Sequence, residues 1–309
     1  MTNSGKPQVV FFGSGPVSAR SLELLQHNFA IEAVITKPTT LQEMTTAAND
    51  VPIHTVANKA ELDLLIDTNA FDSKVAVLID FGIIVSQKVI DSFPLGIVNS
   101  HFSLLPQLRG ADPISFAILE GLNKTGVSLM LLVEAMDEGP VISCGIHELN
   151  GAETTPTLTE RLILLSNALL NDNLPKYISG DAKATDQTKL PQLIPGHPDQ
   201  PSYSRKLTKQ DGLLDFRKPA AQLEREVRAF IEWPKSRTKL ASKDVIITQA
   251  YAIPSIGADQ KPGDTTVVKE TGQIGIATSG GTFWIEKLKP AGKKEMTAAA
   301  FLAGYGHLF

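Results

Sequence analysis

The sequence predicts an α/β protein in which a Rossmann-like, mostly parallel sheet domain precedes a small OB-like β-barrel domain. Apolar strand patterns alternate with helical patterns in the first part of the chain, which is typical of a parallel sheet with crossover helices. Short strands at a spacing of about ten residues follow in the last part, as in a small barrel. Because 309 residues are enough for two hydrophobic cores, we place a first domain at 1–185, a linker at 186–204 and a second domain at 205–309.

The first three strands of the sheet are expected at 8–12, 32–36 and 75–79. The third, Val75-Ala-Val-Leu-Ile79, is apolar at every position, which indicates a strand buried on both faces. Helical patterns occur at 41–48 and 59–66, between the second and third strands. This order favours parallel strands joined by crossover helices.

A glycine-rich turn, Gly13-Ser-Gly-Pro-Val-Ser18, follows the first strand and invites comparison with dinucleotide-binding loops. The Gly-x-Gly-x-x-Gly pattern is incomplete, because Ser18 stands in place of the third glycine and Pro16 lies inside the loop. We therefore favour a tight strand-to-helix turn in which Pro16 begins the helix.

Further patterns complete the first domain. The expected elements are a strand that begins at Ile97 and Val98, strands at 126–133 and 141–146, and helices at 86–93, 113–121 and 157–178. Asp112 is expected to cap the second of these helices, with Pro113 in its first turn.

The second domain is expected to contain one helix and several short strands separated by Gly-rich turns. The helix is placed at 220–231, and the strands are placed at 245–248, 265–270, 274–277 and 283–288. Between the two domains, residues 181–204 are rich in Pro, Gln and Asp and have no periodicity, which is typical of a linker.

Charge is divided unevenly along the chain, whose net charge is -4. Residues 1–185 contain 11 Lys and Arg against 20 Asp and Glu, whereas residues 186–309 contain 18 against 13. The second part, with a net charge of +5, is therefore the one expected to contact a polyanion.

Composition excludes several classes of protein. No apolar run approaches the ~18 residues that a membrane span needs, and no signal-peptide pattern precedes the first strand, so we expect a cytoplasmic protein. The single cysteine, Cys144, excludes an internal disulfide and a Cys-based zinc site, and we expect no metal.

Polar residues without a structural purpose gather after the strand at Ile97. Asn99 and His101 share a face there because side chains two apart in a strand point the same way. Asp137 lies in a tight turn, 134–140, after the strand at 126–133. An amide donor, an imidazole and a carboxylate suit acyl transfer to an amine, although each residue alone also fits a purely structural role.

Two stretches, Asn99-Ser-His-Phe-Ser-Leu-Leu-Pro106 with Arg109-Gly110, and Met136-Asp-Glu-Gly139, closely resemble the signature of the 10-formyltetrahydrofolate-dependent formyltransferases. The resemblance implies that Asn99, His101 and Asp137 catalyse formyl transfer and that 10-formyltetrahydrofolate is the formyl donor. It further implies a folate site lined by the loop residues Ser103, Leu104, Leu105 and Pro106.

The second half resembles the C-terminal domain of methionyl-tRNA formyltransferases, through Ser202 to Lys209, Ala221 to Pro234 and Leu288 to Met296. The resemblance implies that the protein formylates the amino group of initiator methionyl-tRNA, and we separately expect a monomer. Candidates for contacts with tRNA phosphates are Lys206, Lys209, Lys287, Lys289, Lys293 and Lys294, and Arg109 is a further candidate for tRNA binding. That family usually carries a long basic loop after the second strand, whereas residues 36–44 here contain only one cation, Lys37.

Three other functions remain open from the sequence. A sugar-nucleotide N-formyltransferase would share the catalytic motifs and the folate. A serine hydrolase would use Ser100 or Ser103, although no Gly-x-Ser-x-Gly motif is present. An RNA-binding module without catalysis would leave the Asn, His and Asp set unexplained.

Overall fold

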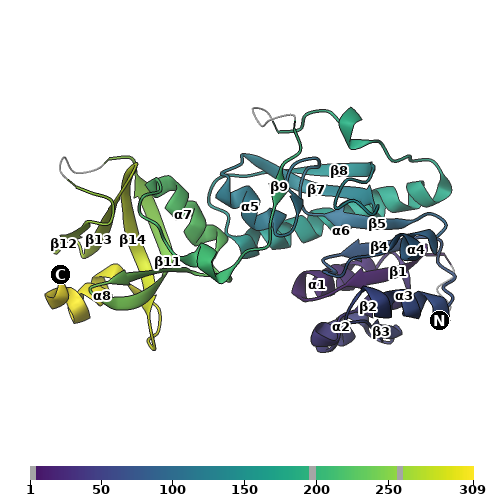
Figure 1. Cartoon of the computed structure of the whole chain (residues 1–309), viewed down its shortest axis with the longest axis horizontal. Coiled ribbons are helices and arrows are strands. Elements are labelled where there is room, and N and C mark those ends of the chain that lie inside the picture. Colours follow the sequence, from purple (N-terminus) through teal and green to yellow (C-terminus); the bar gives the residue numbers. More distant parts are fainter. Residues whose placement is uncertain (1–4, 195–199, 256–259) are drawn as a thin grey trace. The chain divides into compact units, whose positions relative to one another are not determined.

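The computed structural model describes residues 5–194, 200–255 and 260–309, which form two compact units (Figure 1). The first unit comprises Met1–Pro113, Lys124–Glu148 and Thr159–Ser204, and the second comprises Ile114–Asn123, Leu149–Leu158 and Arg205–Phe309. The boundaries that we infer from the sequence, 1–185, 186–204 and 205–309, remain a prediction, and the part of that linker at 195–199 lies outside the described residues.

A seven-stranded sheet forms the centre of the first unit, in the order β3-β2-β1-β4-β5-β7-β8. Its strands are β1 Gln8–Gly13, β2 Ala30–Thr36, β3 Ile53–Thr55, β4 Ala76–Ile79, β5 Ile97–His101, β7 Lys124–Leu131 and β8 Val141–Glu148. The pairs from β3 to β5 are parallel, and β7 and β8 join antiparallel at one end. The predicted mostly parallel sheet is confirmed.

The helices of the chain's first part are α1 Pro16–Leu25, α2 Leu41–Ala48, α3 Lys59–Thr68, α4 Gln87–Asp91, α5 Pro113–Leu119 and α6 Thr155–Ser179, and a 3-10 turn, η1 Pro38–Thr40, precedes α2. Side chains of α3 and α4 pack on the sheet face that carries Val10, Phe12 and Ile35. Asp112 precedes α5 with a φ of 56°, outside the extended conformation usual for a helix cap. No helix in the described ranges has both the length and the apolar character needed to cross a membrane.

The turn between β1 and α1 explains why serine stands where a nucleotide-binding loop has glycine. The Ser18 hydroxyl donates to the carbonyl of Ile79 at 2.6 Å and accepts from the Ser14 amide at 2.8 Å. Pro16 is the first residue of α1, as expected from its fixed φ. The loop is therefore fastened to the end of β4, which favours the tight-turn interpretation.

The second unit is built on an antiparallel sheet in the order β10-β11-β14-β13-β12, with β15 paired to β14. Its strands are β10 Ser236–Leu240, β11 Lys243–Ile253, β12 Thr265–Val268, β13 Gln273–Thr278, β14 Gly281–Pro290 and β15 Met296–Thr297. Helices α7 Ala220–Ala229 and α8 Ala298–Tyr305 contribute Leu223 and Phe301 to its core. The predicted second, small OB-like β domain is confirmed as this separate antiparallel sheet domain, while β10 and α8 were not predicted.

The segment predicted to be a linker contains ordered structure that pairs with β6, Arg109–Gly110, and with the start of β8. Its described part includes the 3-10 turn η2 Gln187–Lys189 and the strand β9 Tyr203–Ser204. Strand β9 pairs in parallel with β6, Arg109–Gly110, and Thr185 bridges to Val141. This segment consequently contacts β6 and the start of β8, the strand that follows the turn carrying Asp137.

Candidate active site

Strand β5 carries Asn99 and His101 in the middle of the seven-stranded sheet. Asn99 lies opposite Leu78 of β4 and Met130 of β7, and His101 lies opposite Ser128 of β7. Asn99 is thus paired on both sides and His101 on the β7 side, and the two side chains project from one face because they are two residues apart. Asn99 is 8% exposed and His101 is 7% exposed.

Asp137 reaches these two side chains from the turn between β7 and β8. Its Oδ1 accepts from Asn99 Nδ2 at 3.4 Å, and its Oδ2 lies 3.7 Å from His101 Nδ1. The amide of Gly110 donates to the same Oδ2 at 2.7 Å. The three residues predicted from separate motifs therefore form one buried cluster.

The hydrogen bond on the far side of the His101 ring determines which nitrogen is free to react. His101 Nε2 lies 3.0 Å from the carbonyl oxygen of Leu108. A carbonyl only accepts, so Nε2 carries the proton of the neutral ring. In that neutral form Nδ1 faces the Asp137 carboxylate with its lone pair, 3.7 Å from Oδ2.

The loop from Ser103 to Pro106 is held to strand β7 by hydrogen bonds with Ser128. Ser128 donates to the carbonyl of Ser103 at 2.8 Å and accepts from the Leu105 amide at 3.0 Å. Leu104 and Leu105 are each 2% exposed, whereas Pro106, after a cis peptide bond, is partly exposed. The side chain of Pro106 is thus the part of this loop most open to a ligand.

Neither serine proposed for a hydrolase is bonded to the cluster. Ser100 and Ser166 share a hydrogen bond of 2.7 Å, and the Ser103 hydroxyl donates to the carbonyl of Gln107 at 2.5 Å. Because a serine nucleophile needs a histidine base within hydrogen-bond reach, this arrangement disfavours the hydrolase alternative.

A buried pair that sequence reasoning missed supports the Asp137 turn. Arg109 is 8% exposed and donates through Nη2 to Gln187 Oε1 at 2.7 Å, and Gln187 is 5% exposed. Arg109 also pairs with Glu138, Nη1 to Oε1, at 3.1 Å. Burial and these partners favour a role within the protein for Arg109 over the phosphate contact predicted for it. Gln187 gave no sequence signal because it lies in a polar stretch without periodicity.

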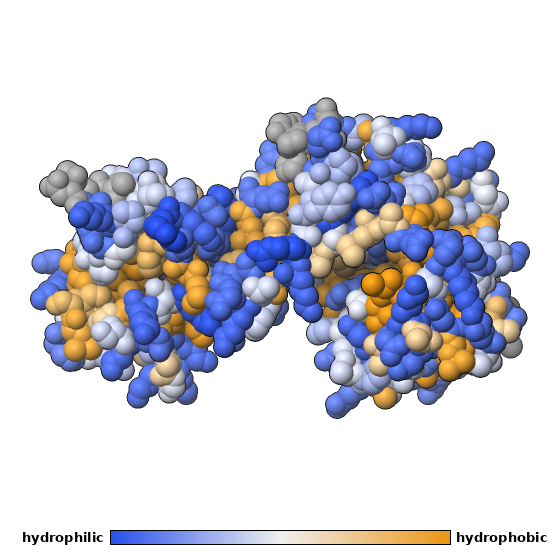
Figure 2. Space-filling model, viewed as in Figure 1, coloured by the Kyte–Doolittle hydropathy of each residue, from blue (hydrophilic) through white to orange (hydrophobic). Residues whose placement is uncertain are grey.

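Two large apolar side chains of this unit, Met136 and Ile84, are exposed. Met136 directly precedes Asp137 and is 66% exposed, and Ile84, in the loop after β4, is 72% exposed. Figure 2 shows apolar surface among hydrophilic surface over the unit that holds the cluster. Exposed apolar side chains beside polar groups are typical of a site for a ligand with a flat aromatic part.

The end of β4 adds a charged group beside these loops. Removal from water raises the pKa of the Asp80 carboxyl, and the negative charge of Asp112 acts in the same direction. The positive charge of Lys37 opposes both. A Cβ added at Gly82 would lie 2.8 Å from Lys37 Nζ, so Lys37 lies against the loop after β4.

The remaining basic candidates lie in the second unit. All six lysines are exposed, and none forms an ion pair with another residue that the structure describes; they are Lys206, Lys209, Lys287, Lys289, Lys293 and Lys294. Lys287 and Lys289 share one side of β14, and Lys293 and Lys294 lie in the turn that follows it. These charges are available to a polyanion.

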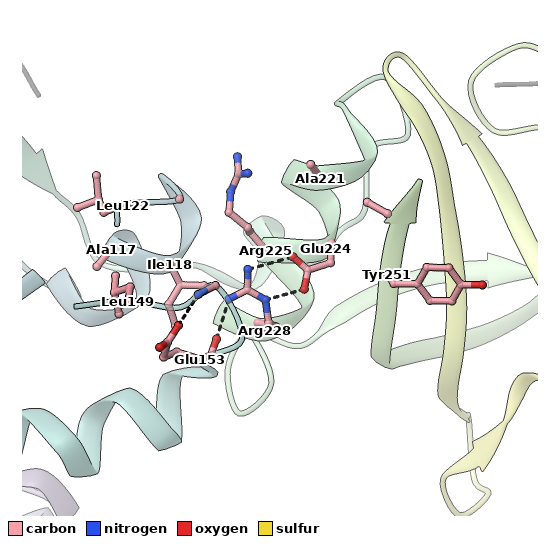
Figure 3. A pocket seen from close by; sticks show the side chains of 13 residues that line it. Ala117, Ile118, Leu122, Leu149, Glu153, Ala221, Glu224, Arg225, Arg228 and Tyr251 are labelled. Atoms are coloured by element: carbon pink, nitrogen blue, oxygen red, sulfur yellow. Dashed lines mark hydrogen bonds and ion pairs between the residues drawn. The ribbon is translucent and has the colours of Figure 1, made fainter. Parts of the chain in front are cut away.

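The second unit also contains a hollow of about 430 Å³ lined by residues of α5, α7 and β11 (Figure 3). Arg228 is held there between the carboxylate of Glu224, at 2.5 Å, and the carbonyl of Glu153, at 2.8 Å. Arg225 donates through Nε to the carbonyl of Leu119 at 3.0 Å. These bonds hold structural elements together, and the lining lacks the histidine that acyl transfer would use.

Comparison with protein families gives two matches that together span most of the chain. Residues 8–174 match the family described as formyl transferase, and residues 206–306 match the family described as formyl transferase, C-terminal domain. The methionyl-tRNA formyltransferase of Myxococcus xanthus is 32% identical over 97% of this chain and 96% of its own length. The enzyme of the same name from Thiobacillus denitrificans is 33% identical over 96% of each chain.

Solved structures show the same fold at lower sequence identity. An N-formyltransferase from Helicobacter canadensis, solved with folinic acid and dTDP-3-aminofucose, has a TM-score of 0.66 and 17% identity, covering 94% of this chain and 100% of its own. HypX from Aquifex aeolicus, solved with tetrahydrofolic acid, has a TM-score of 0.60 and 18% identity, covering 96% of this chain and 47% of its own.

Proposed function

The chain belongs to the formyl transferase family, and on this premise we propose that it moves the formyl group of 10-formyltetrahydrofolate onto the amino group of initiator methionyl-tRNA. The product, N-formylmethionyl-tRNA, would serve translation initiation. The observation that carries the proposal is the buried cluster in which Asp137 lies 3.4 Å from Asn99 and 3.7 Å from His101, in a chain whose relatives bear this activity.

The residues around the cluster fit a folate. A pterin is flat and apolar on its faces, and Met136, next to Asp137 in the chain, and Pro106, in the loop after β5, offer apolar surface. The loop formed by Ser103, Leu104, Leu105 and Pro106 would hold it chiefly through Pro106, because the three other side chains are buried. When bound, 10-formyltetrahydrofolate supplies an activated formyl carbonyl that an unprotonated amine attacks.

Asn99 is suited to stabilise the negative charge that develops on the formyl oxygen. Its Nδ2 carries two protons, and the 3.4 Å contact with Asp137 occupies at most one of them. Burial strengthens a hydrogen bond to a developing oxyanion because little water competes. General magnitudes give about 10²–10³ in rate for one such donor.

His101 and Asp137 are suited to move the proton from the incoming amine to the departing nitrogen. The Asp137 carboxylate lies beside His101 Nδ1, where it stabilises the protonated ring. The carbonyl of Leu108 accepts the hydrogen bond from Nε2 and so fixes the ring. The amine loses one proton as the new C–N bond forms, and the folate nitrogen gains one as the old C–N bond breaks, so no other reactant is needed. Such acid and base catalysis contributes about 10²–10⁴ in rate.

The exposed lysines of the second unit provide the charge that an aminoacyl-tRNA requires. Each contact between a lysine and a phosphate releases counterions, which favours binding at low salt. Lys206, Lys209, Lys287, Lys289, Lys293 and Lys294 are proposed for this role. We further propose that the protein acts as a monomer in the cytoplasm, where aminoacyl-tRNA is made and used.

Formyl transfer to competing amines tests the proposal. The protein is incubated with 10-formyltetrahydrofolate labelled in the formyl group and, in parallel, with methionyl-tRNA and with amino-sugar nucleotides. Label is expected on methionyl-tRNA at a much higher kcat/KM than on any amino sugar. Transfer to the sugar alone would replace this function with that of a sugar-nucleotide N-formyltransferase, and release of free formate alone would indicate a hydrolase.

A further inference from the structure

Gln187 uses every donor of its buried carboxamide on the Asp137 turn. Nε2 donates to the carbonyl of Asp137 at 2.8 Å and to the carbonyl of Gly139 at 2.8 Å. Both protons of the Gln187 carboxamide therefore donate to the two carbonyls that flank Glu138. Gln187 lies 50 residues from Asp137, at the first position of the short turn η2.

Arg109 determines which way this carboxamide points. Its Nε and Nη2 both donate to Gln187 Oε1, at 3.1 Å and 2.7 Å. Two donors on one side and two carbonyls on the other leave a single orientation in which every hydrogen bond is made. The remaining nitrogen, Nη1, contacts Glu138 at 3.1 Å and the Tyr203 hydroxyl at 3.2 Å, so the guanidinium is itself fixed.

The Asp137 turn requires such support because its backbone conformation is unfavourable. Asp137 has a φ of 54°, in the left-handed region that residues with a Cβ rarely adopt. The carboxylate is held by the Gly110 amide, and the carbonyl of the same residue is held by Gln187. Asp137 is therefore fastened at both ends, and the position of its carboxylate relative to His101 depends on both contacts.

We propose that Gln187 is a positioning residue for formyl transfer, which holds the Asp137 carboxylate beside Asn99 and His101 and is itself oriented by Arg109. This role rests on the proposed function. Gln187 touches neither reactant in this scheme and acts through Asp137. Its loss should therefore lower kcat and leave the KM for methionyl-tRNA nearly unchanged.

Two variants separate the contacts that Gln187 makes. Gln187→Met keeps the volume and removes all four hydrogen bonds, while Gln187→Glu keeps an acceptor for Arg109 and removes both donors to the turn. The matched control is Gln42→Glu, which makes the same chemical change at an exposed position of α2. We expect kcat to fall about 10- to 100-fold in both variants of Gln187 and to stay unchanged in the control.

A double-mutant cycle distinguishes positioning from general loss of structure. If Gln187 acts through Asp137, then Gln187→Met should cost no further activity in an Asp137→Ala background. Additive losses, normal kcat in both Gln187 variants, or a fall in kcat that parallels a fall in melting temperature would overturn the proposal.

Amide hydrogen exchange at Gly110 provides a readout that needs no substrate. The Gly110 amide donates to Asp137, so displacement of the carboxylate should speed its exchange at least about tenfold in Gln187→Met and Gln187→Glu. Unchanged exchange in both variants would contradict the positioning role, whatever the substrate is. Absence of formyl transfer by the wild-type protein would instead contradict the proposed function.

Discussion

Gly139 is the position at which a single methyl group should displace the candidate catalytic carboxylate. A Cβ built on Gly139 would lie 1.8 Å from the backbone oxygen of Leu131, and real Cβ atoms essentially never approach a neighbour closer than 3.0 Å. Gly139→Ala must therefore move the turn away from β7 by about 1.2 Å, the difference between these two distances.

This displacement is large compared with the tolerance of the cluster. Asp137 is two residues away, and its distances of 3.4 Å to Asn99 and 3.7 Å to His101 are already at the limit of direct contact. A misplacement of about 1 Å in a catalytic site costs on the order of 100-fold in rate. We expect kcat of Gly139→Ala to fall by about that factor, with an overpacking cost of about 1–3 kcal/mol in the free energy of unfolding.

The assay is single-turnover formyl transfer at saturating substrates, with the melting temperature measured on the same samples. Gly304→Ala is the matched control, since no atom lies within 4 Å of a Cβ at Gly304 and the residue lies within α8, where alanine favours the helix by about 1 kcal/mol. A folded Gly139→Ala variant with near-normal turnover would refute the reasoning.

Two further predictions concern the second unit and the loop after β2. Hydrogen bonds from Arg205 and then Thr208 hold the pKa of the Asp211 carboxyl well below its usual range, so the unfolded chain binds a proton first as the pH falls. The contribution of Asp211 to the free energy of unfolding should therefore be complete above about pH 4 and decline below it. In urea unfolding, Asp211→Asn should lower the free energy of unfolding by about 1 kcal/mol at neutral pH and should flatten the decline at acid pH. A decline at acid pH that is unchanged in the variant would contradict this prediction. At one fixed salt concentration, Lys37→Ala should reduce tRNA binding less than the double change Lys293→Ala, Lys294→Ala, because Lys37 lies against Gly82. Discrimination among acceptor-stem sequences should be weak. A larger loss of binding from Lys37→Ala would show that the loop after β2 contributes more to tRNA binding than the two lysines do.

The fold could be predicted where local patterns carry the information. Helix α2 occupies Leu41–Ala48, the range predicted from apolar periodicity, and β4 lies within the apolar run predicted at 75–79. Asn99, His101 and Asp137 were recognised because each lies in a short motif. Their convergence across 38 residues of chain required the structure.

The contacts that Gln187 and Arg109 make could not be predicted, because they join residues that are far apart in the sequence. Gln187 acts through partners that lie 48 to 78 residues away, and nothing in a polar, proline-rich stretch encodes such distant pairing. The contact between Arg109 and tRNA stays a prediction, but a sequence displays the charge of Arg109 and not its burial against Gln187, which leaves Arg109 8% exposed. In both cases tertiary contacts decide what the side chain does.

The most direct test of the account is single-turnover formylation of methionyl-tRNA by Asn99→Ala and His101→Ala with both substrates saturating. Saturation removes effects on binding, so the rate reports transition-state stabilisation alone. We predict a loss of about 10²–10³ for Asn99→Ala and about 10²–10⁴ for His101→Ala, with melting temperatures close to that of the wild type. Near-normal turnover by either folded variant would contradict the assignment of the catalytic cluster.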